Sequence, residues 1–116
     1  DIGAPVPGAI PWLVRLQQYG ARIILYTMRS NNMETGDLLR KAVQYMEANG
    51  VRLYGVNRNP DQDDWTSSPK AYGDVYVDDS AIGCPLVQVG GFARPCVDWE
   101  TAGPQLEHML LSRMQR

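Results

Sequence analysis

The sequence has few of the residues that mark membrane proteins, disulfide-rich proteins or generic nucleic-acid binders. It contains two cysteines and one histidine, and its 11 basic residues against 13 acidic ones give a net charge of −2. Two cysteines are too few for a disulfide framework, and an acidic balance lacks the basic stripe of most nucleic-acid binders. No apolar run approaches the roughly 20 residues of a membrane span. We therefore expect a cytoplasmic protein without a membrane or nucleic-acid partner.

The scarce cysteines and the single histidine have ordinary structural explanations. Cys84 and Cys96 each have a proline neighbour in a region rich in strand-forming residues, which favours small buried side chains over reactive thiols. His108 lies in a mixed polar and apolar helical pattern near the C-terminus. These residues carry no functional hypothesis.

Apolar residues alternate between helical and strand spacing along the 116-residue chain, which is long enough for one domain with a single core. Alternating strands and helices favour a three-layer α/β sandwich with a mainly parallel sheet and right-handed crossovers. A long polar loop is expected at 57–70. The predicted strands are 22–27, 51–56, 74–78 and 86–89. Three helices are predicted. The first is 7–19, the second is capped by Asn31 and Glu34 and ends at Gly50, and the third is 101–114.

Two adjacent carboxylates, Asp78 and Asp79, end the predicted strand 74–78. In an open parallel sheet, ligands bind outside the carboxyl ends of the strands, so acids there face a site. Two carboxylates about 4 Å apart at an effective dielectric of about 20 repel by roughly 4 kcal/mol. A divalent metal, an amine or open water could offset this repulsion. Asp79 alone could instead cap a helical turn at Ser80.

Two further segments offer phosphate-binding chemistry. The strand 22–27 runs into Thr27-Met28-Arg29, which presents a hydroxyl and successive backbone amides. Lys70 follows Ser68-Pro69, and the proline stiffens its approach. Taken alone, Thr27 could be a plain strand residue and Lys70 a solvated surface lysine. Arg29 could bind a phosphate bidentately or pair with a surface acid for little net energy.

In this order, Thr27, Lys70 and the pair Asp78-Asp79 resemble three motifs of the haloacid dehalogenase-like phosphohydrolase superfamily. The resemblance covers most of the chain and implies a single domain at 1–116, of the small type without a cap, with a Rossmann-like sheet in the strand order 5-4-1-2-3. It implies magnesium-dependent hydrolysis of a phosphomonoester through an aspartyl-phosphate intermediate. Mg²⁺ would be held by Asp79 with Asp78 in support, and the phosphate by Thr27, Met28, Arg29 and Lys70. Thr27 and Lys70 would be the catalytic residues of this chain.

The family's first motif, Asp-x-Asp-Gly-Thr/Val, does not occur in the sequence. In the family this motif ends the central first strand and supplies the nucleophile and the general acid/base. Residues 1–8 look like the loop that follows it, so the resemblance begins one strand late. We expect that strand to precede Asp1 in the complete protein, and the 116-residue chain by itself to lack phosphatase activity.

Two other classes of protein stay open beside the enzyme. One is a haloacid dehalogenase-like domain that has lost catalysis and acts as a binding module. The other is a receiver-type signalling domain, in which the paired acids precede the threonine and lysine; here they follow, which counts against it. The acidic tract Asp61, Asp63 and Asp64 lacks the glycine and terminal glutamate of a calcium loop and is interpreted as a solvated loop.

Overall fold

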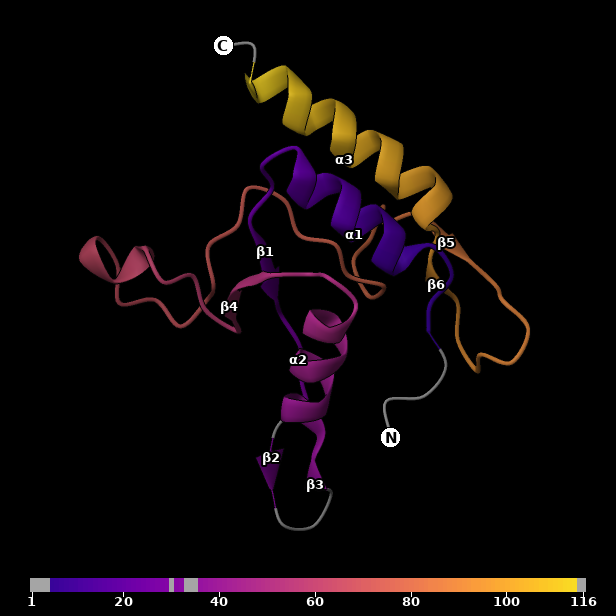
Figure 1. Ribbon diagram of the computed structural model, residues 1–116, viewed down its shortest axis with the longest axis horizontal. Helices are drawn as coiled ribbons and strands as arrows, with labels where there is room; N and C mark the ends of the chain where they lie inside the picture. The colour runs from indigo at the N-terminus through magenta and orange to yellow at the C-terminus, as the bar shows by residue number, and fades with distance from the viewer. Residues whose placement is uncertain (1–4, 30, 33–35, 115–116) are drawn as a thin grey trace. The chain divides into compact units, whose positions relative to one another are not determined.

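The computed structural model describes residues 5–29, 31–32 and 36–114, and these fall into two compact units. The first unit comprises residues 22–74, and the second comprises residues 5–21 and 75–114. Each unit combines helices with short strands (Figure 1). The prediction of a mixed α/β protein is therefore confirmed.

The first unit is built around a parallel pair of strands. β1 (Ile23–Leu25) pairs with β4 (Leu53–Val56), with a register shift after Ile23. A parallel pair needs a crossover between its strands, and α2 (Leu38–Ala48), which packs against β4, lies within it. Val51 is fully buried, and its N–H donates to the Met46 carbonyl at 3.0 Å, which joins the end of α2 to the approach to β4.

The start of α2 differs from the predicted cap. A short antiparallel hairpin, β2 (Asn31–Asn32) with β3 (Gly36–Asp37), precedes the helix. The Asn31 Oδ1 accepts the Arg40 N–H at 3.0 Å. Asn31 therefore caps α2 from across the hairpin. Glu34, the other member of the expected cap, lies outside the described residues.

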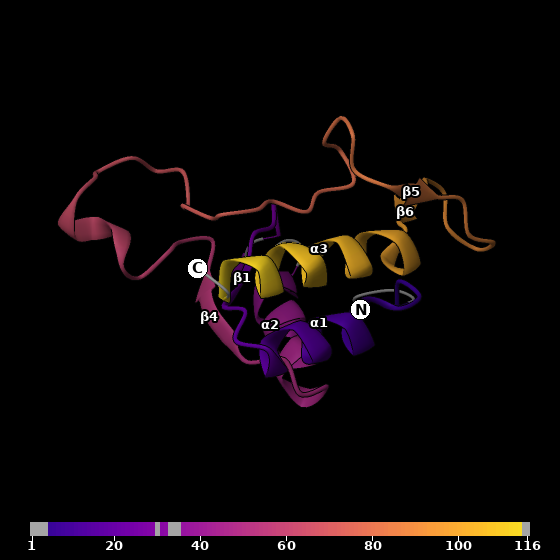
Figure 2. The ribbon, with the colours of Figure 1, turned by 90° about the horizontal axis from the view of Figure 1, so that it is seen from above.

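The second unit contains two helices that lie side by side, α1 (Ala9–Gln18) and α3 (Trp99–Met114) (Figures 1 and 2). Gly103 of α3 is buried against the indole ring of Trp12. The Arg15 guanidinium pairs with the Glu107 carboxylate across the two helices. Their interface therefore combines a close backbone-to-ring contact with an ion pair.

The C-terminal helix begins two residues before its predicted start. The Asp98 carbonyl accepts the Ala102 N–H at 2.8 Å, and the Asp98 carboxylate accepts the Thr101 hydroxyl at 2.7 Å. The Thr101 N–H, one of the first-turn donors that lack a partner four residues earlier in the helix, also donates to the Asp98 carbonyl, at 3.1 Å. Before it, β5 (Leu86–Val87) and β6 (Cys96–Val97) form an antiparallel pair in which Cys96 is buried.

The predicted strand 74–78 is wrong. These residues lie in none of the three two-stranded sheets that the described chain forms, and Val75 and Val77 are exposed. Strand-forming residues become a strand only where a neighbour supplies the backbone ladder, and 74–78 acquires no such ladder. The expected fifth strand, 86–89, is confirmed in its first two residues. Within the described residues, no helix combines the length and apolarity needed to cross a bilayer.

Candidate functional site

The carboxyl ends of β1 and β4 are joined by the side chain and backbone of Asn57. Its N–H donates to the Leu25 carbonyl at 2.7 Å, and its Oδ1 accepts the Thr27 N–H, also at 2.7 Å. Asn57 has a φ of 56°, a left-handed conformation that asparagine tolerates better than most residues. Thr27 is thus held in place from the end of the neighbouring strand.

The segment after β1 forms a tight side-chain turn. The Thr27 Oγ1 accepts the Arg29 N–H at 3.1 Å, which commits that amide to the turn. Among the described contacts, the Thr27 hydroxyl accepts a bond and does not donate one, so its proton can be offered to a ligand. Met28 is 99% exposed. This geometry suits an oxyanion at Thr27 and the Met28 amide, without the Arg29 amide.

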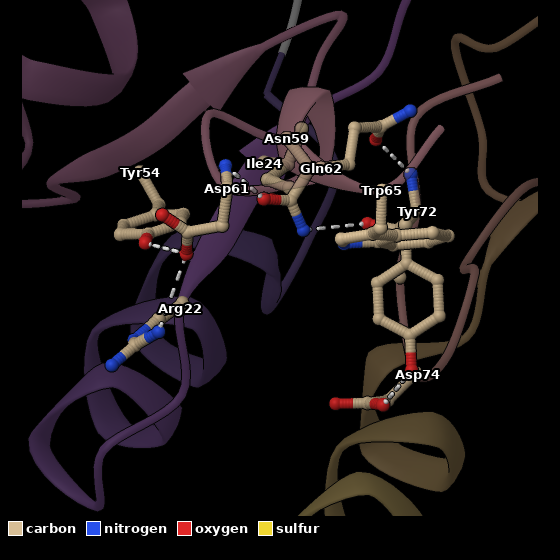
Figure 3. Close-up of a pocket in the computed structure, with 10 residues that line it drawn as sticks. Arg22, Ile24, Tyr54, Asn59, Asp61, Gln62, Trp65, Tyr72 and Asp74 are labelled. Atoms are coloured by element: carbon tan, nitrogen blue, oxygen red, sulfur yellow. Dashed lines mark hydrogen bonds and ion pairs between the residues drawn. The ribbon is translucent and has the colours of Figure 1, made fainter. Parts of the chain in front are cut away.

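The segment from Asn57 to Asp74 is longer than most connections in a compact domain and borders a pocket of about 270 Å³ (Figure 3). A 3₁₀ turn, η1 (Gln62–Asp64), lies within this segment. Rings of Trp65 and Tyr72 meet edge to face, with centroids 5.6 Å apart. The residues that line the pocket are Arg22, Ile24, Tyr54, Asn59, Asp61, Gln62, Trp65, Tyr72, Gly73 and Asp74.

Two carboxamides hold the backbone of Tyr72 from either side, as Figure 3 shows. The Gln62 Oε1 accepts the Tyr72 N–H at 2.7 Å, and the Asn59 Nδ2 donates to the Tyr72 carbonyl at 3.1 Å. Gln62 also donates to the Lys70 carbonyl at 2.9 Å. The end of the segment, including the exposed Lys70, is therefore fastened to η1.

At the other side of the pocket, Asp61 is shared by two partners. Tyr54 donates its hydroxyl proton to the Asp61 carboxylate, and the Arg22 guanidinium lies 3.7 Å from the same carboxylate and over the Tyr54 ring. The pKa of Tyr54 is raised above its ordinary value, mainly by the hydrogen bond to Asp61 and to a smaller extent by partial desolvation. Farther along, Asp63 pairs with Arg58. Two members of the acidic tract are thus engaged by arginines, as suits a solvated loop.

Asp78 and Asp79 lie in the second unit, exposed at a turn that follows a segment outside any sheet. The Asp78 Oδ1 accepts the Ser80 N–H at 2.9 Å, so Asp78 closes the turn for which Asp79 was the candidate cap. The Arg94 guanidinium lies 4.0 Å from the Asp79 carboxylate and provides a cation that the local sequence did not indicate. Both groups are exposed, and such pairs contribute little.

The carboxylates of Asp78 and Asp79 offer the hard oxygen atoms that Mg²⁺ prefers. Their exposure leaves oxygen atoms accessible to a hydrated ion. Within the part of the chain that the structure describes, no cluster of three or more potential metal-ligating side chains occurs. Asp78 and Asp79 thus match the donor chemistry of Mg²⁺ and supply two carboxylates, fewer than the six or more ligands that such an ion takes.

The candidate residues fall into two groups. Thr27, Met28, Arg29 and Lys70 belong to the first unit, and Asp78 and Asp79 to the second. Sequence reasoning missed Asn57, Asn59, Gln62 and Arg94. An asparagine directly after a predicted strand could have indicated a left-handed residue, whereas no local signal marks Gln62 as buried or Arg94 as a partner of Asp79.

Comparison of the chain with protein-family profiles, with curated proteins and with solved structures found no match in any of the three.

Proposed function

We propose that this chain is the phosphate- and metal-binding part of a magnesium-dependent phosphohydrolase of the haloacid dehalogenase-like type. The observation that carries the proposal is the position of Thr27. It follows a parallel strand at its carboxyl end and is tied by Asn57 to the end of the neighbouring parallel strand. Ligands of open α/β sheets bind at such ends.

The proposed fold is a three-layer sandwich in which β1 and β4 are the second and third strands of the order 5-4-1-2-3. That order requires these two strands to be parallel neighbours, which agrees with their pairing. Residues 74–78, which lie in no sheet here, would have to pair with the first strand of that order to become its fourth strand. The nucleophilic aspartate would end the first strand of that order. Two free cysteines among the described residues accord with a reducing cytoplasm.

Each side chain has a role that follows from its chemistry. The Thr27 hydroxyl and the Met28 N–H donate to phosphoryl oxygens, and the Lys70 ammonium offsets the charge that develops on them in the transition state. Asp78 and Asp79 would hold Mg²⁺, which when bound reduces the repulsion between the phosphate and the attacking carboxylate. The substrate is a phosphomonoester.

The test is an assay of the full-length gene product with p-nitrophenyl phosphate and Mg²⁺. Lys70→Ala should lower kcat/KM at least about tenfold, which corresponds to ~1.4 kcal/mol of transition-state stabilisation. The chain's other lysine, Lys41, is exposed on α2 and provides the matched control. Lys41→Ala should leave kcat/KM unchanged.

If the folded full-length protein releases no phosphate from a panel of phosphomonoesters, the proposal that it is a phosphohydrolase is wrong. The second candidate, a binding module without catalysis, would then replace it. The absence of Asp-x-Asp-Gly-Thr/Val from this sequence is the observation that favours the second candidate. Equal kcat/KM for Lys70→Ala and the unmodified protein would instead remove Lys70 from the mechanism.

A further inference from the structure

Gln62 is the one polar residue among those described that is classed as buried, with 5% of its surface exposed. A buried carboxamide must find partners for its oxygen and its two N–H groups. Its Oε1 accepts the Tyr72 N–H at 2.7 Å, and its Nε2 donates to the carbonyls of Lys70 at 2.9 Å and Ser68 at 3.3 Å. All three partners are backbone groups.

These three backbone groups flank the α-carbon of Lys70. Ser68 lies two residues before it and Tyr72 two residues after it. The Lys70 N–H adds a fourth tie, because it donates to the Ser68 Oγ at 3.2 Å. The backbone from which the lysine side chain extends is thus held on both sides, while the side chain itself is exposed.

In the sequence alone, Pro69 is the residue that would place Lys70. Proline restricts its own φ and the conformation of the preceding residue, but it does not anchor the segment to the rest of the fold. The Gln62 amide supplies that anchor from η1 through its bond to the Lys70 carbonyl. Figure 3 shows its second bond, to the Tyr72 N–H. Since a catalytic group displaced by about 1 Å can lose up to about 100-fold in rate, such an anchor has a functional consequence.

We propose that Gln62 is a positioning residue for Lys70: its buried carboxamide holds the lysine's backbone where the ammonium group meets the transferred phosphoryl group. This inference rests on the proposed function. Gln62 itself would contact no reacting atom. It acts through Lys70, so removal of its hydrogen bonds should matter only while the lysine is present.

The experiment is a double-mutant cycle on kcat in the full-length protein, with p-nitrophenyl phosphate and Mg²⁺. Gln62→Met keeps the length and approximate volume of the side chain and removes its hydrogen bonds. We expect it to lower kcat at least about fivefold in the unmodified background and less than about twofold in the Lys70→Ala background. Gln44→Met, at an exposed position on α2 in the same unit, should leave kcat unchanged.

The outcomes separate the inference from the function on which it rests. Equal fold losses in the two backgrounds would show a general structural role and overturn the inference, with the enzyme intact. If the unmodified protein is an active phosphatase and Lys70→Ala has the same activity, the role of Gln62 is overturned and the enzyme function stands. Absence of activity in the folded full-length protein would overturn both.

If Gln62→Met does not fold, as judged by circular dichroism, Gln62→Glu replaces it under the same criteria. Glutamate keeps an acceptor for the Tyr72 N–H, and because a carboxyl group has at most one donor, it loses at least one of the two bonds to the carbonyls of Lys70 and Ser68.

Discussion

Replacement of Gly103 by alanine tests the packing of α1 against α3. A Cβ atom at Gly103 would lie 2.2 Å from Cδ2 and 2.5 Å from Cε2 of the Trp12 ring, far inside the roughly 3.5–4.0 Å of a normal carbon contact. A tryptophan ring is rigid and cannot yield as the end of a flexible side chain can. The helices must therefore separate or the indole must leave its position.

The expected magnitude is the balance of two effects. In a helix interior, alanine is favoured over glycine by about 1 kcal/mol, although Pro104 follows and disfavours a helical conformation for a residue with a Cβ before it. Overpacking typically costs about 1–3 kcal/mol, and the degree of overlap here places Gly103→Ala at the upper end. We expect a net loss of about 2 kcal/mol in the free energy of unfolding.

The assay is urea denaturation followed by far-ultraviolet circular dichroism. With a slope of about 2 kcal/mol per molar urea, the midpoint should fall by about 1 M. Gly90→Ala is the matched control, because no atom lies within 4 Å of its added Cβ. It should change stability by less than about 0.5 kcal/mol.

A second variant separates the clash from other effects of the substitution. In a Trp12→Leu background the ring is gone, so Gly103→Ala should cost at least about 1 kcal/mol less than in the unmodified protein. If Gly103→Ala stabilises the unmodified protein by the propensity difference, or costs the same in both backgrounds, the contact between Gly103 and Trp12 does not exist as described.

Three further predictions concern the candidate site. Asn57→Ala should reduce the free energy of unfolding by about 1–2 kcal/mol, because it loses the bond to the Thr27 N–H and places alanine at positive φ; Asn57→Gly should cost less in the same urea titration, and equal losses would count against the conformational argument. NMR titration should show the Tyr54 hydroxyl ionising above its ordinary pKa. Because this pKa is raised in the folded state, its contribution to stability is present below the unfolded pKa and is lost as pH rises through the folded value; Asp61→Asn should lower the Tyr54 pKa, and an unchanged value would refute the assigned cause. Calorimetric titration of Mg²⁺ into the full-length protein should give weaker binding for Asp79→Asn, and equal affinities would remove Asp79 from the site.

Several elements could be predicted because their signals are local. The helical spacing of Trp12, Leu13 and Leu16, ended by Gly20, predicted α1 to within two residues at its start. β1 and β4 lie inside the predicted strands 22–27 and 51–56. Side-chain periodicity and a glycine after a helix act within a few residues, so the sequence carries them directly.

The strand 74–78 failed because a ladder needs a neighbour from elsewhere in the chain. Val75 and Val77 have the β-branched side chains typical of a strand, yet they are exposed and lie in no sheet. The same limit applies to Asn31, which caps α2 through Arg40, nine residues away. Propensity describes what a segment can form, whereas long-range pairing decides what it forms.

The sequence by itself determined the types of residue at the candidate site: a threonine after a strand, a lysine after a proline and two adjacent carboxylates. Only the tertiary structure decided that Asn57 holds Thr27 and that Gln62 anchors the backbone around Lys70. A carboxamide has no helical or strand periodicity that marks it as buried. Its partners are backbone groups, which every residue possesses, so their identity emerges only when folding brings distant segments within hydrogen-bonding distance.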